Sequence, residues 1–297
     1  MLLITGITGH TGKYFLRELI TNKYEGQIRC IVRKTSDTTL LDNSGLNFEK
    51  VVGDLEDEEF VQKAMRGVDT VMHISGILQT PNVIRAAVKA NVERGIFVHT
   101  TGIYSKFKSA SDEYKKIEHE LDKLINQEQV NIKITILRPT MIYGDLCDLN
   151  MSKFIKMVDT LRLFPVINHG SCLIQPVNAR DLGKAYFQVL GMKKEQSKHE
   201  YVLSGKKPIS MINAFRLISD NLGKKTIFVS FPLGIGVLIA RTLKLCTLGK
   251  VDYIERVQRM GEDRSFPHKD AITDFGYNPM TFEEGIKIEV DQYLNIK

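Results

Sequence analysis

Three glycines near the start of the chain are spaced so that the backbone there can bind an anion. Gly6, Gly9 and Gly12 lie within TGITGHTG, after the apolar residues 2–4 and before a segment whose apolar residues recur at helical spacing. A glycine-rich turn between a strand and a helix exposes unpaired N–H groups at the positive end of the helix dipole, which favours an anion such as a pyrophosphate. The spacing predicts a dinucleotide site, and the alternative is a tight turn that binds nothing.

The residues at the end of the second predicted strand bear on which dinucleotide is bound. An NAD site uses an acidic side chain there to accept hydrogen bonds from the ribose 2′-hydroxyl, whereas an NADP site uses a cation for the 2′-phosphate. The strand ends at Arg33 and Lys34, and the first acidic residue after it is Asp37. Arg33 can meet a phosphate with a planar fork of donors. These residues favour NADP(H) over NAD(H), and the alternative is a solvated loop charge.

The N-terminal half alternates short β-branched runs with amphipathic segments. Continuous apolar runs are typical of parallel strands that are buried on both faces. The predicted strands cover residues 1–5, 28–33, 47–52, 68–74, 96–101 and 132–138, and the predicted helices cover 12–22, 58–66, 81–93 and 111–127. This order indicates right-handed βαβ units and a doubly wound parallel sheet of the α/β class. Ligands of such sheets bind at the carboxyl ends of the strands, where the three glycines fall.

After Pro139 the alternation gives way to longer irregular stretches. We expect residues 1–145 to form the dinucleotide-binding domain and residues 146–297 to form a smaller substrate-binding region packed on the sheet. The apolar stretch 228–240 is shorter than the roughly 20 residues that a membrane-spanning helix needs. We expect it to be a helix that enters the core or lies beneath a substrate lid, and the alternative is contact with a membrane surface.

Composition excludes several classes of protein. The net charge of +6 fits either an anionic small ligand or a solvated basic surface, and no RNA-binding, finger or basic-helix motif accompanies it, so no nucleic-acid partner is expected. The four cysteines are widely separated and the seven histidines form no pair at ligand spacing, so neither a disulfide framework nor a metal site is predicted. The first predicted strand begins at Met1 and leaves no room for a signal peptide, so we expect a cytoplasmic protein. Nothing in the pattern indicates an oligomeric state.

Eight short motifs follow one another in a familiar order. They are TGITGHTG, CIVRK, GDLED, DTVMHISG, FVHTTGIYS, YKKIEHEL, LRPTMIYG and QPVNARDLGKA. Each is weak alone, but the ordered set resembles the extended and atypical short-chain dehydrogenase/reductase superfamily, which includes nucleotide-sugar epimerases and NmrA-like proteins. The resemblance covers nearly all of residues 1–190. It implies a Rossmann-type sheet, an NAD(P) cofactor and a small-molecule substrate.

The resemblance also implies which residues meet the cofactor. They are Gly6, Thr8, Gly9, His10, Thr11 and Gly12 at the pyrophosphate, Arg33 and Lys34 at the 2′-phosphate, Asp54 and Leu55 at the adenine, Ile74, Ser75 and Gly76 along the cofactor, and Pro139 and Thr140 beside the nicotinamide. Two of these have structural alternatives. Asp54 is also suited to cap the following helix, and Pro139 forces an extended residue before it. Ser75 stands where the superfamily usually has alanine.

Active members of the superfamily use a Ser or Thr after the fifth strand and a Tyr-x-x-x-Lys pair on the next helix. That spacing places the two side chains one turn apart on one face, so the ammonium lowers the pKa of the tyrosine hydroxyl and makes it a proton donor at neutral pH. Thr101, with Thr100 beside it, supplies the hydroxyl here. Tyr114 and Lys116 are the best acid and cation that the helix offers.

The helix departs from the required pair. If Tyr114 is the acid, position 118 holds Glu rather than Lys, and if Lys116 is the lysine, the tyrosine position holds Asp112. Another Tyr-x-x-x-Lys, at Tyr104 and Lys108, precedes the predicted helix and is interpreted as chance.

Two functional hypotheses remain open. The first is an oxidoreductase or epimerase-like enzyme, with NADP(H) preferred, that moves hydride to and from a carbonyl or nucleotide-sugar substrate. The second is a catalytically silent, NADP(H)-sensing regulatory protein of the NmrA-like kind, which the degenerate Tyr-x-x-x-Lys site favours. Fold alone does not decide between them.

Overall fold

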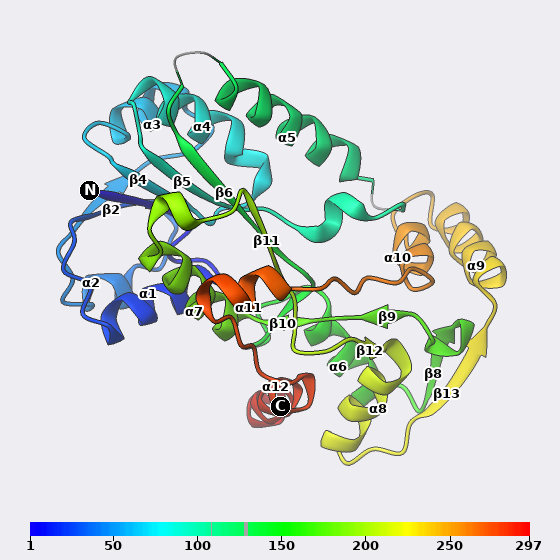
Figure 1. Ribbon diagram of the computed structural model, residues 1–297. Helices are drawn as coiled ribbons and strands as arrows, with labels where there is room; N and C mark the ends of the chain where they lie inside the picture. Colours follow the sequence, from blue (N-terminus) through cyan, green and yellow to red (C-terminus); the bar gives the residue numbers. More distant parts are fainter. Residues whose placement is uncertain (108, 128–129) are drawn as a thin grey trace.

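The computed structural model describes residues 1–107, 109–127 and 130–297, and within these residues seven strands form one central sheet (Figure 1). In spatial order the strands are β11 (Glu200–Leu203), β6 (Lys133–Pro139), β5 (Arg94–Val98), β4 (Thr70–His73), β1 (Leu2–Thr5), β2 (Ile28–Val32) and β3 (Phe48–Val52). Every neighbouring pair is parallel. The predicted α/β class and the Rossmann-type doubly wound sheet are confirmed.

The direction of winding reverses between β1 and β4. From β1 the chain adds β2 and then β3 on one side, and it then returns to add β4, β5, β6 and finally β11 on the other side. Such a reversal opens a crevice beyond the carboxyl ends of the strands, because the connecting helices diverge to opposite faces. The glycine turn follows β1 directly and therefore lies at this crevice.

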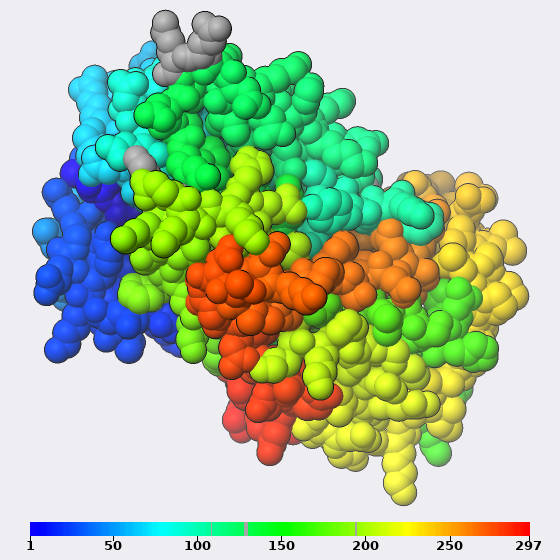
Figure 2. All heavy atoms as spheres, viewed as in Figure 1, coloured from blue at the N-terminus to red at the C-terminus, as the bar shows by residue number. Residues whose placement is uncertain are grey.

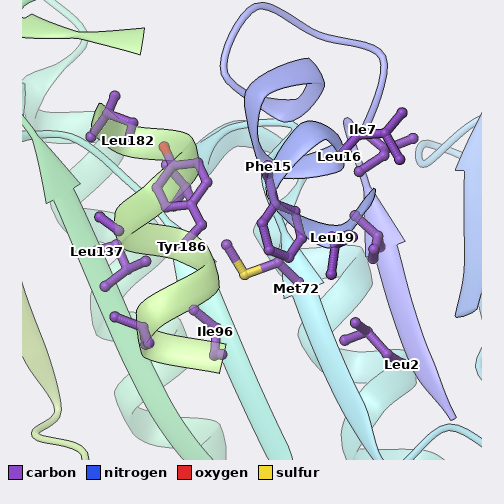
Figure 3. Packing of buried hydrophobic residues seen from close by; sticks show 14 of the residues in the cluster. Leu2, Ile7, Phe15, Leu16, Leu19, Met72, Ile96, Leu137, Leu182 and Tyr186 are labelled. Carbon is purple, nitrogen blue, oxygen red and sulfur yellow. The ribbon is translucent and has the colours of Figure 1, made fainter. Parts of the chain in front are cut away.

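Helices cover both faces of the sheet (Figure 1). One face carries α3 (Glu58–Ala64), α4 (Thr80–Lys89) and α5 (Ser111–Ile125), and the other carries α1 (Gly12–Thr21) and α7 (Ala179–Gly191). On the second face, Phe15 and Leu19 of α1 pack beside Tyr186 of α7 and over Met72 of β4 (Figure 3). The strands and helices predicted up to residue 138 are all present, with ends that differ by a few residues, and the short helix α2 (Thr39–Asp42) is additional.

The elements after β6 divide between the sheet and a second core. α7 and β11 complete the sheet and its cover, whereas the second core gathers side chains such as Phe164, Phe215 and Ile286. The remaining elements are β7 (Ile142–Tyr143), α6 (Met151–Thr160), β8 (Leu163–Ile167), β9 (Leu173–Ile174), β10 (Val177–Asn178), β12 (Ile209–Ser210), α8 (Met211–Asn221), β13 (Ile227–Phe231), α9 (Leu233–Cys246), α10 (Ile254–Arg259), α11 (Lys269–Phe275) and α12 (Phe282–Ile296). The division into residues 1–145 and 146–297 stays a prediction.

The stretch 228–240 covers most of β13 and the first part of α9, and the expectation that its helix enters the core is wrong. The other expectation, a helix beneath a substrate lid, stays a prediction. Ile235, Leu238 and Ile239 are exposed, and only the small residues Gly236 and Ala240 of α9 are buried. The stretch is apolar almost all round, so its sequence did not indicate which side of the helix faces the protein. Among the described residues, no helix has the length and apolar character needed to cross a bilayer.

Candidate dinucleotide-binding and active site

A cleft of about 940 Å³ opens at the carboxyl ends of the strands. This volume lies at the upper end of the ~300–1,000 Å³ range of small-molecule sites. Its walls come from the turns after β1, β2, β3, β4, β5 and β6, and from the segment 259–266 between α10 and α11. The cleft therefore brings the predicted cofactor edge together with residues from the last sixth of the chain.

The glycine turn forms one end of the cleft. Gly6, with φ +74°, turns the chain after β1, and its carbonyl accepts a hydrogen bond from the Gly9 N–H at 3.0 Å. Thr8, Gly9 and His10 line the cleft beside it, and so does Thr11. Within the described residues no side chain caps α1. The N–H groups of Lys13 and Tyr14 already donate to the carbonyls of Gly9 and Thr11, at 3.0 and 3.1 Å, so an anion here would be bound by the turn and the very start of the helix.

Gly12 serves the turn in another way. It is not among the residues that line the cleft, and a Cβ built on it would lie 2.0 Å from the carbonyl oxygen of Gly6. Gly12 thus lets the start of α1 pack directly on the turn. A Cβ on Gly9 would meet only that same oxygen, at 3.2 Å, and would otherwise face open space.

The loop after β2 brings one basic and one acidic side chain to the cleft, and the acidic one is already hydrogen-bonded within the loop. Arg33, Ser36 and Asp37 line it, whereas Lys34 is exposed and does not. Among the described residues, no carboxylate pairs with the Arg33 guanidinium. Asp37 Oδ1 accepts hydrogen bonds from the hydroxyl and the N–H of Thr39, at 2.7 and 3.0 Å, which lowers the pKa of Asp37. Asp37 is thus hydrogen-bonded within its own loop, while Arg33 lines the cleft without a carboxylate partner among the described residues.

The turns after β3 and β4 form the middle of the cleft. Asp54 and Leu55 line it, and Asp54 Oδ1 accepts the N–H of Glu56 at 3.0 Å. The cap of α3 is Asp57, whose Oδ1 accepts the N–H of Phe60 at 3.0 Å, so Asp54 does not have the alternative role of capping that helix. Ile74 and Ser75 also line the cleft, and Gly76 does not.

A buried histidine, His73, holds the carboxyl ends of β1 and β4 together. Burial lowers the pKa of His73 to about 3, so the ring is neutral. Its Nε2 lies 2.9 Å from the carbonyl oxygen of Gly76 and must donate, because a carbonyl only accepts. Its Nδ1 then accepts the hydroxyl of Thr5 at 2.7 Å. His73 thus has a structural role at this edge of the sheet.

The turn after β5 brings Thr100 and Thr101 to the cleft. The hydroxyl of Thr101 donates to the carbonyl of Pro139 at 3.3 Å, and that of Thr140 donates to the carbonyl of Gln175 at 2.5 Å. Pro139 itself lies behind the wall and does not line the cleft. Its carbonyl, rather than its ring, contributes to the site by holding Thr101.

The other two predicted catalytic residues are not in the cleft lining. Tyr114 is half-buried on α5, near Glu255 and Arg259 of α10, and Lys116 is exposed. Burial, together with the charge of Glu113, raises the pKa of the Tyr114 hydroxyl, which is opposite to what a proton donor at neutral pH needs. Their catalytic roles stay predictions. Lys108, the partner in the other Tyr-x-x-x-Lys spacing, lies outside the described residues.

Glu118, which stands four residues after Tyr114, forms a buried ion pair. Its carboxylate accepts from Arg138 Nη1 and Nη2, at 2.5 and 2.8 Å, and lies 2.8 Å from His99 Nδ1. Burial of Glu118 favours its neutral form, but the hydrogen bonds from His99 and Arg138 outweigh it and lower the pKa of Glu118 to about 2. Arg138 Nε also lies 2.8 Å from Glu200 of β11. This network fixes α5 to β6 and β11 behind the turn that carries Thr101.

The far wall of the cleft consists largely of residues outside the recognised motifs. Residues that the sequence interpretation did not assign to the site include Tyr104, Cys147, Asp148, Gln175, Arg259, Glu262, Asp263, Arg264 and Phe266. Gln175 holds this wall in place, because its Nε2 donates to Gly205 O at 2.7 Å and its Oε1 accepts the N–H of Phe266 at 3.0 Å. Two of these residues lie within recognised motifs, Tyr104 in FVHTTGIYS and Gln175 at the start of QPVNARDLGKA.

Residues 6–146 match a family model described as NAD(P)H-binding. This segment runs from the glycine turn past β6 and contains every predicted cofactor-binding residue. Residues 6–146 are thus similar to NAD(P)H-binding domains, in agreement with the predicted resemblance to the extended and atypical short-chain dehydrogenase/reductase superfamily.

The relatives and solved structures to which the chain is similar have names that refer to different substrates. A relative named sterol demethylase protein B, from Methylococcus capsulatus, is 25% identical over 172 residues, which are 48% of this chain and 51% of that protein. The chain thus spans about half the length of this relative. Triphenylmethane reductase of a Citrobacter species has a TM-score of 0.73 at 20% identity, covering 98% of this chain and 99% of the other. UDP-glucuronic acid 4-epimerase from Bacillus cereus has a TM-score of 0.74 at 16% identity, and the match covers 100% of this chain and 99% of the other.

Proposed function

We propose that the protein is an NADP(H)-dependent oxidoreductase or epimerase-like enzyme that moves hydride between the nicotinamide and a carbonyl or nucleotide-sugar carbon. The observation that carries the proposal is the continuity of the cleft. It runs from the glycine turn, past Thr101, to a separate wall that includes Arg259 and Arg264. A site that only sensed a dinucleotide would not need this second wall. The experiment is a soak or co-crystal with NADPH, in which the nicotinamide C4 should lie beside Thr101 with free space toward Arg264.

The preference for NADP(H) rests on the loop after β2. Arg33 faces the cleft without a carboxylate partner among the described residues, while the nearest acid, Asp37, is hydrogen-bonded to Thr39. We expect the native protein to bind NADPH about ten- to a hundredfold more tightly than NADH, because charge-assisted contacts contribute roughly 1.5–3 kcal/mol. Arg33→Ala should remove most of this difference, as measured by calorimetric titration of both cofactors.

Two further variants complete that measurement. Lys34→Ala measures how much the second predicted cation contributes to the preference for NADPH. Lys89→Ala changes an exposed lysine at the end of α4 and is the control that should leave the affinities for NADPH and NADH unchanged. Equal affinity of the native protein for NADPH and NADH would refute the proposed preference.

A second candidate, an NADP(H)-sensing protein without turnover, is favoured by one observation. Tyr114 and Lys116 lie outside the cleft lining, and Glu118 occupies the lysine position in an ion pair with Arg138. Hydride transfer to a carbonyl leaves an alkoxide that needs a proton, and the loss of a positioned acid costs about 10²–10⁴ in rate. The two candidates therefore differ in turnover rather than in cofactor affinity.

We expect slow turnover with general carbonyl substrates despite firm binding of NADPH. NADPH oxidation should be measured with a panel of ketones, quinones and nucleotide sugars, and rates should fall at least about tenfold below the ~10 s⁻¹ that is typical of enzymes. Where a substrate is turned over, Tyr114→Phe should lower kcat by about 10²-fold if this hydroxyl donates the proton. Brisk turnover that survives Tyr114→Phe would assign the proton transfer to another group of the cleft.

A further inference from the structure

Helix α9 has its apolar side chains on the outside of the molecule. Leu238, Ile239 and Leu245 are 64%, 54% and 77% exposed, and Leu248, just beyond the helix, is 89% exposed. The helix packs against α10, and its buried residues are the small Gly236 and Ala240, of which Gly236 lies against Val257 of α10 and Ile167 of β8. In Figures 1 and 2 it lies at the edge of the molecule, beyond α10 and away from the central sheet. A soluble protein rarely exposes so many large apolar residues together unless they meet a partner.

Basic residues outnumber acidic ones around this apolar face. Residues 221–251 contain no Asp or Glu and contain five basic residues, Lys224, Lys225, Arg241, Lys244 and Lys250. Two of these are paired with acids from outside the segment, Lys224 with Asp159 at 3.2 Å and Lys244 with Asp252 at 2.7 Å. Arg241 has no ion pair among the described residues, and it lies about 120° around the helix from Ile235, because each residue advances by about 100°. The outward face of α9 is thus apolar with an unpaired cation on its flank, an arrangement typical of a helix that lies in the interface of a membrane.

We propose that α9 and the loop after it, residues 233–250, dock on the surface of an anionic lipid bilayer. The large apolar residues would enter the boundary between headgroups and acyl chains while the cations meet lipid phosphates, each contributing about 1 kcal/mol near a negative surface, or about fivefold in affinity. The helix would lie on the membrane and not cross it, in agreement with the lack of a membrane-spanning helix among the described residues.

The charge also argues against a second copy of the chain as the occupant. A two-fold dimer places the same surface against itself. Arg241 and Lys250, which have no ion pair among the described residues, would then be brought toward the same cations of the other copy. A negatively charged surface matches the patch, whereas its own copy repels it.

Docking through α9 would also bring the cleft toward the lipid. α10 packs against α9, and its last residue, Arg259, lines the cleft. One helix therefore separates the apolar face from the substrate end of the site. The docking proposal stands on the patch itself and does not depend on the identity of the substrate.

Sedimentation with lipid vesicles tests the proposal. We expect the native protein to bind vesicles of phosphatidylcholine and phosphatidylserine at least tenfold more tightly than vesicles of phosphatidylcholine alone. Raising the salt from about 0.1 to 1 M should weaken this binding, because the Debye length falls from about 10 to about 3 Å. The double variant Leu238→Ser/Ile239→Ser should bind at least tenfold more weakly, since each exposed side chain would lose its apolar insertion.

The controls distinguish lipid from other partners. Ile272→Ser changes a residue of α11 that is 50% exposed and lies outside the patch, and it should bind vesicles like the native chain. Thermal unfolding of each variant should match that of the native chain, because the replaced side chains are exposed. Native protein that ignores the anionic vesicles, or α9 variants that bind like the native chain, would overturn the proposal. So would a dimer, seen by analytical ultracentrifugation, that Leu238→Ser/Ile239→Ser dissociates.

Discussion

Gly9→Val should abolish binding of NADPH while the protein stays folded. Gly9 lines the cleft at the turn before α1, and a Cβ placed on it meets only the Gly6 carbonyl oxygen, at 3.2 Å. A shift of a few tenths of an ångström accommodates that contact, and the rest of the valine side chain then stands in the space that the pyrophosphate needs. Losing two charge-assisted N–H contacts of roughly 1.5–3 kcal/mol each corresponds to at least about a hundredfold loss of affinity.

The neighbouring glycines supply the comparison. Gly12→Ala should unfold the protein or lower its stability strongly, because the new Cβ would lie 2.0 Å from the Gly6 backbone oxygen. Gly191→Val, at the end of α7 with open space around its Cβ, should change neither stability nor affinity by more than about 0.5 kcal/mol. Calorimetric titration of the folded variants with NADPH measures the loss of affinity. A folded Gly9→Val variant that binds NADPH with native affinity would show that the pyrophosphate does not bind at this turn.

The second large effect is expected at Glu118. Glu118→Ala would leave Arg138, whose side chain is 5% exposed, without its bidentate partner. Removing one member of a buried pair costs about 3–5 kcal/mol, and we expect the lower end because Arg138 Nε keeps its ion pair with Glu200. Urea denaturation measures the loss. Glu120→Ala, at an exposed residue on the same helix, should lie within about 0.5 kcal/mol of the native protein.

The same network predicts how stability depends on pH. The pKa of Glu118 falls from an ordinary 4.5 to about 2 in the folded protein, so its contribution is present above pH 4.5 and is lost as the pH falls toward 2. The native protein should therefore lose more stability than Glu118→Ala between pH 5 and pH 3. Equal losses in the two proteins would show that the ion pair contributes little.

The contacts of Glu118 also indicate that a lysine at this position would be destabilising. Glu118→Lys would regenerate the Tyr-x-x-x-Lys spacing with Tyr114, but it would place a second cation against Arg138 in a buried site. In this chain the carboxylate of Glu118 holds α5 to β6 and, through Arg138, to β11.

The sequence by itself determined the sheet and the cofactor edge. Short apolar runs and helical periodicity are local signals, so they predicted β1 to β6 and the helices between them, and the glycine spacing marked the turn after β1. Because the carboxyl ends of parallel strands share one edge, the positions of Arg33, Asp54 and Ser75 in the cleft followed from the topology.

Only the tertiary structure decided which side chains share the cleft beyond that edge. Arg259, at the end of α10, and Arg264, in the loop after it, lie more than 100 residues after β6, and no periodicity encodes the path of this loop. Tyr114 and Lys116 are two residues apart rather than the four of the required pattern, and both lie outside the cleft lining. The apolar run 228–240 likewise did not indicate which side of its helix packs against the rest of the protein. Local sequence encodes the element, whereas the direction of each face depends on long-range packing that a single stretch of sequence does not contain.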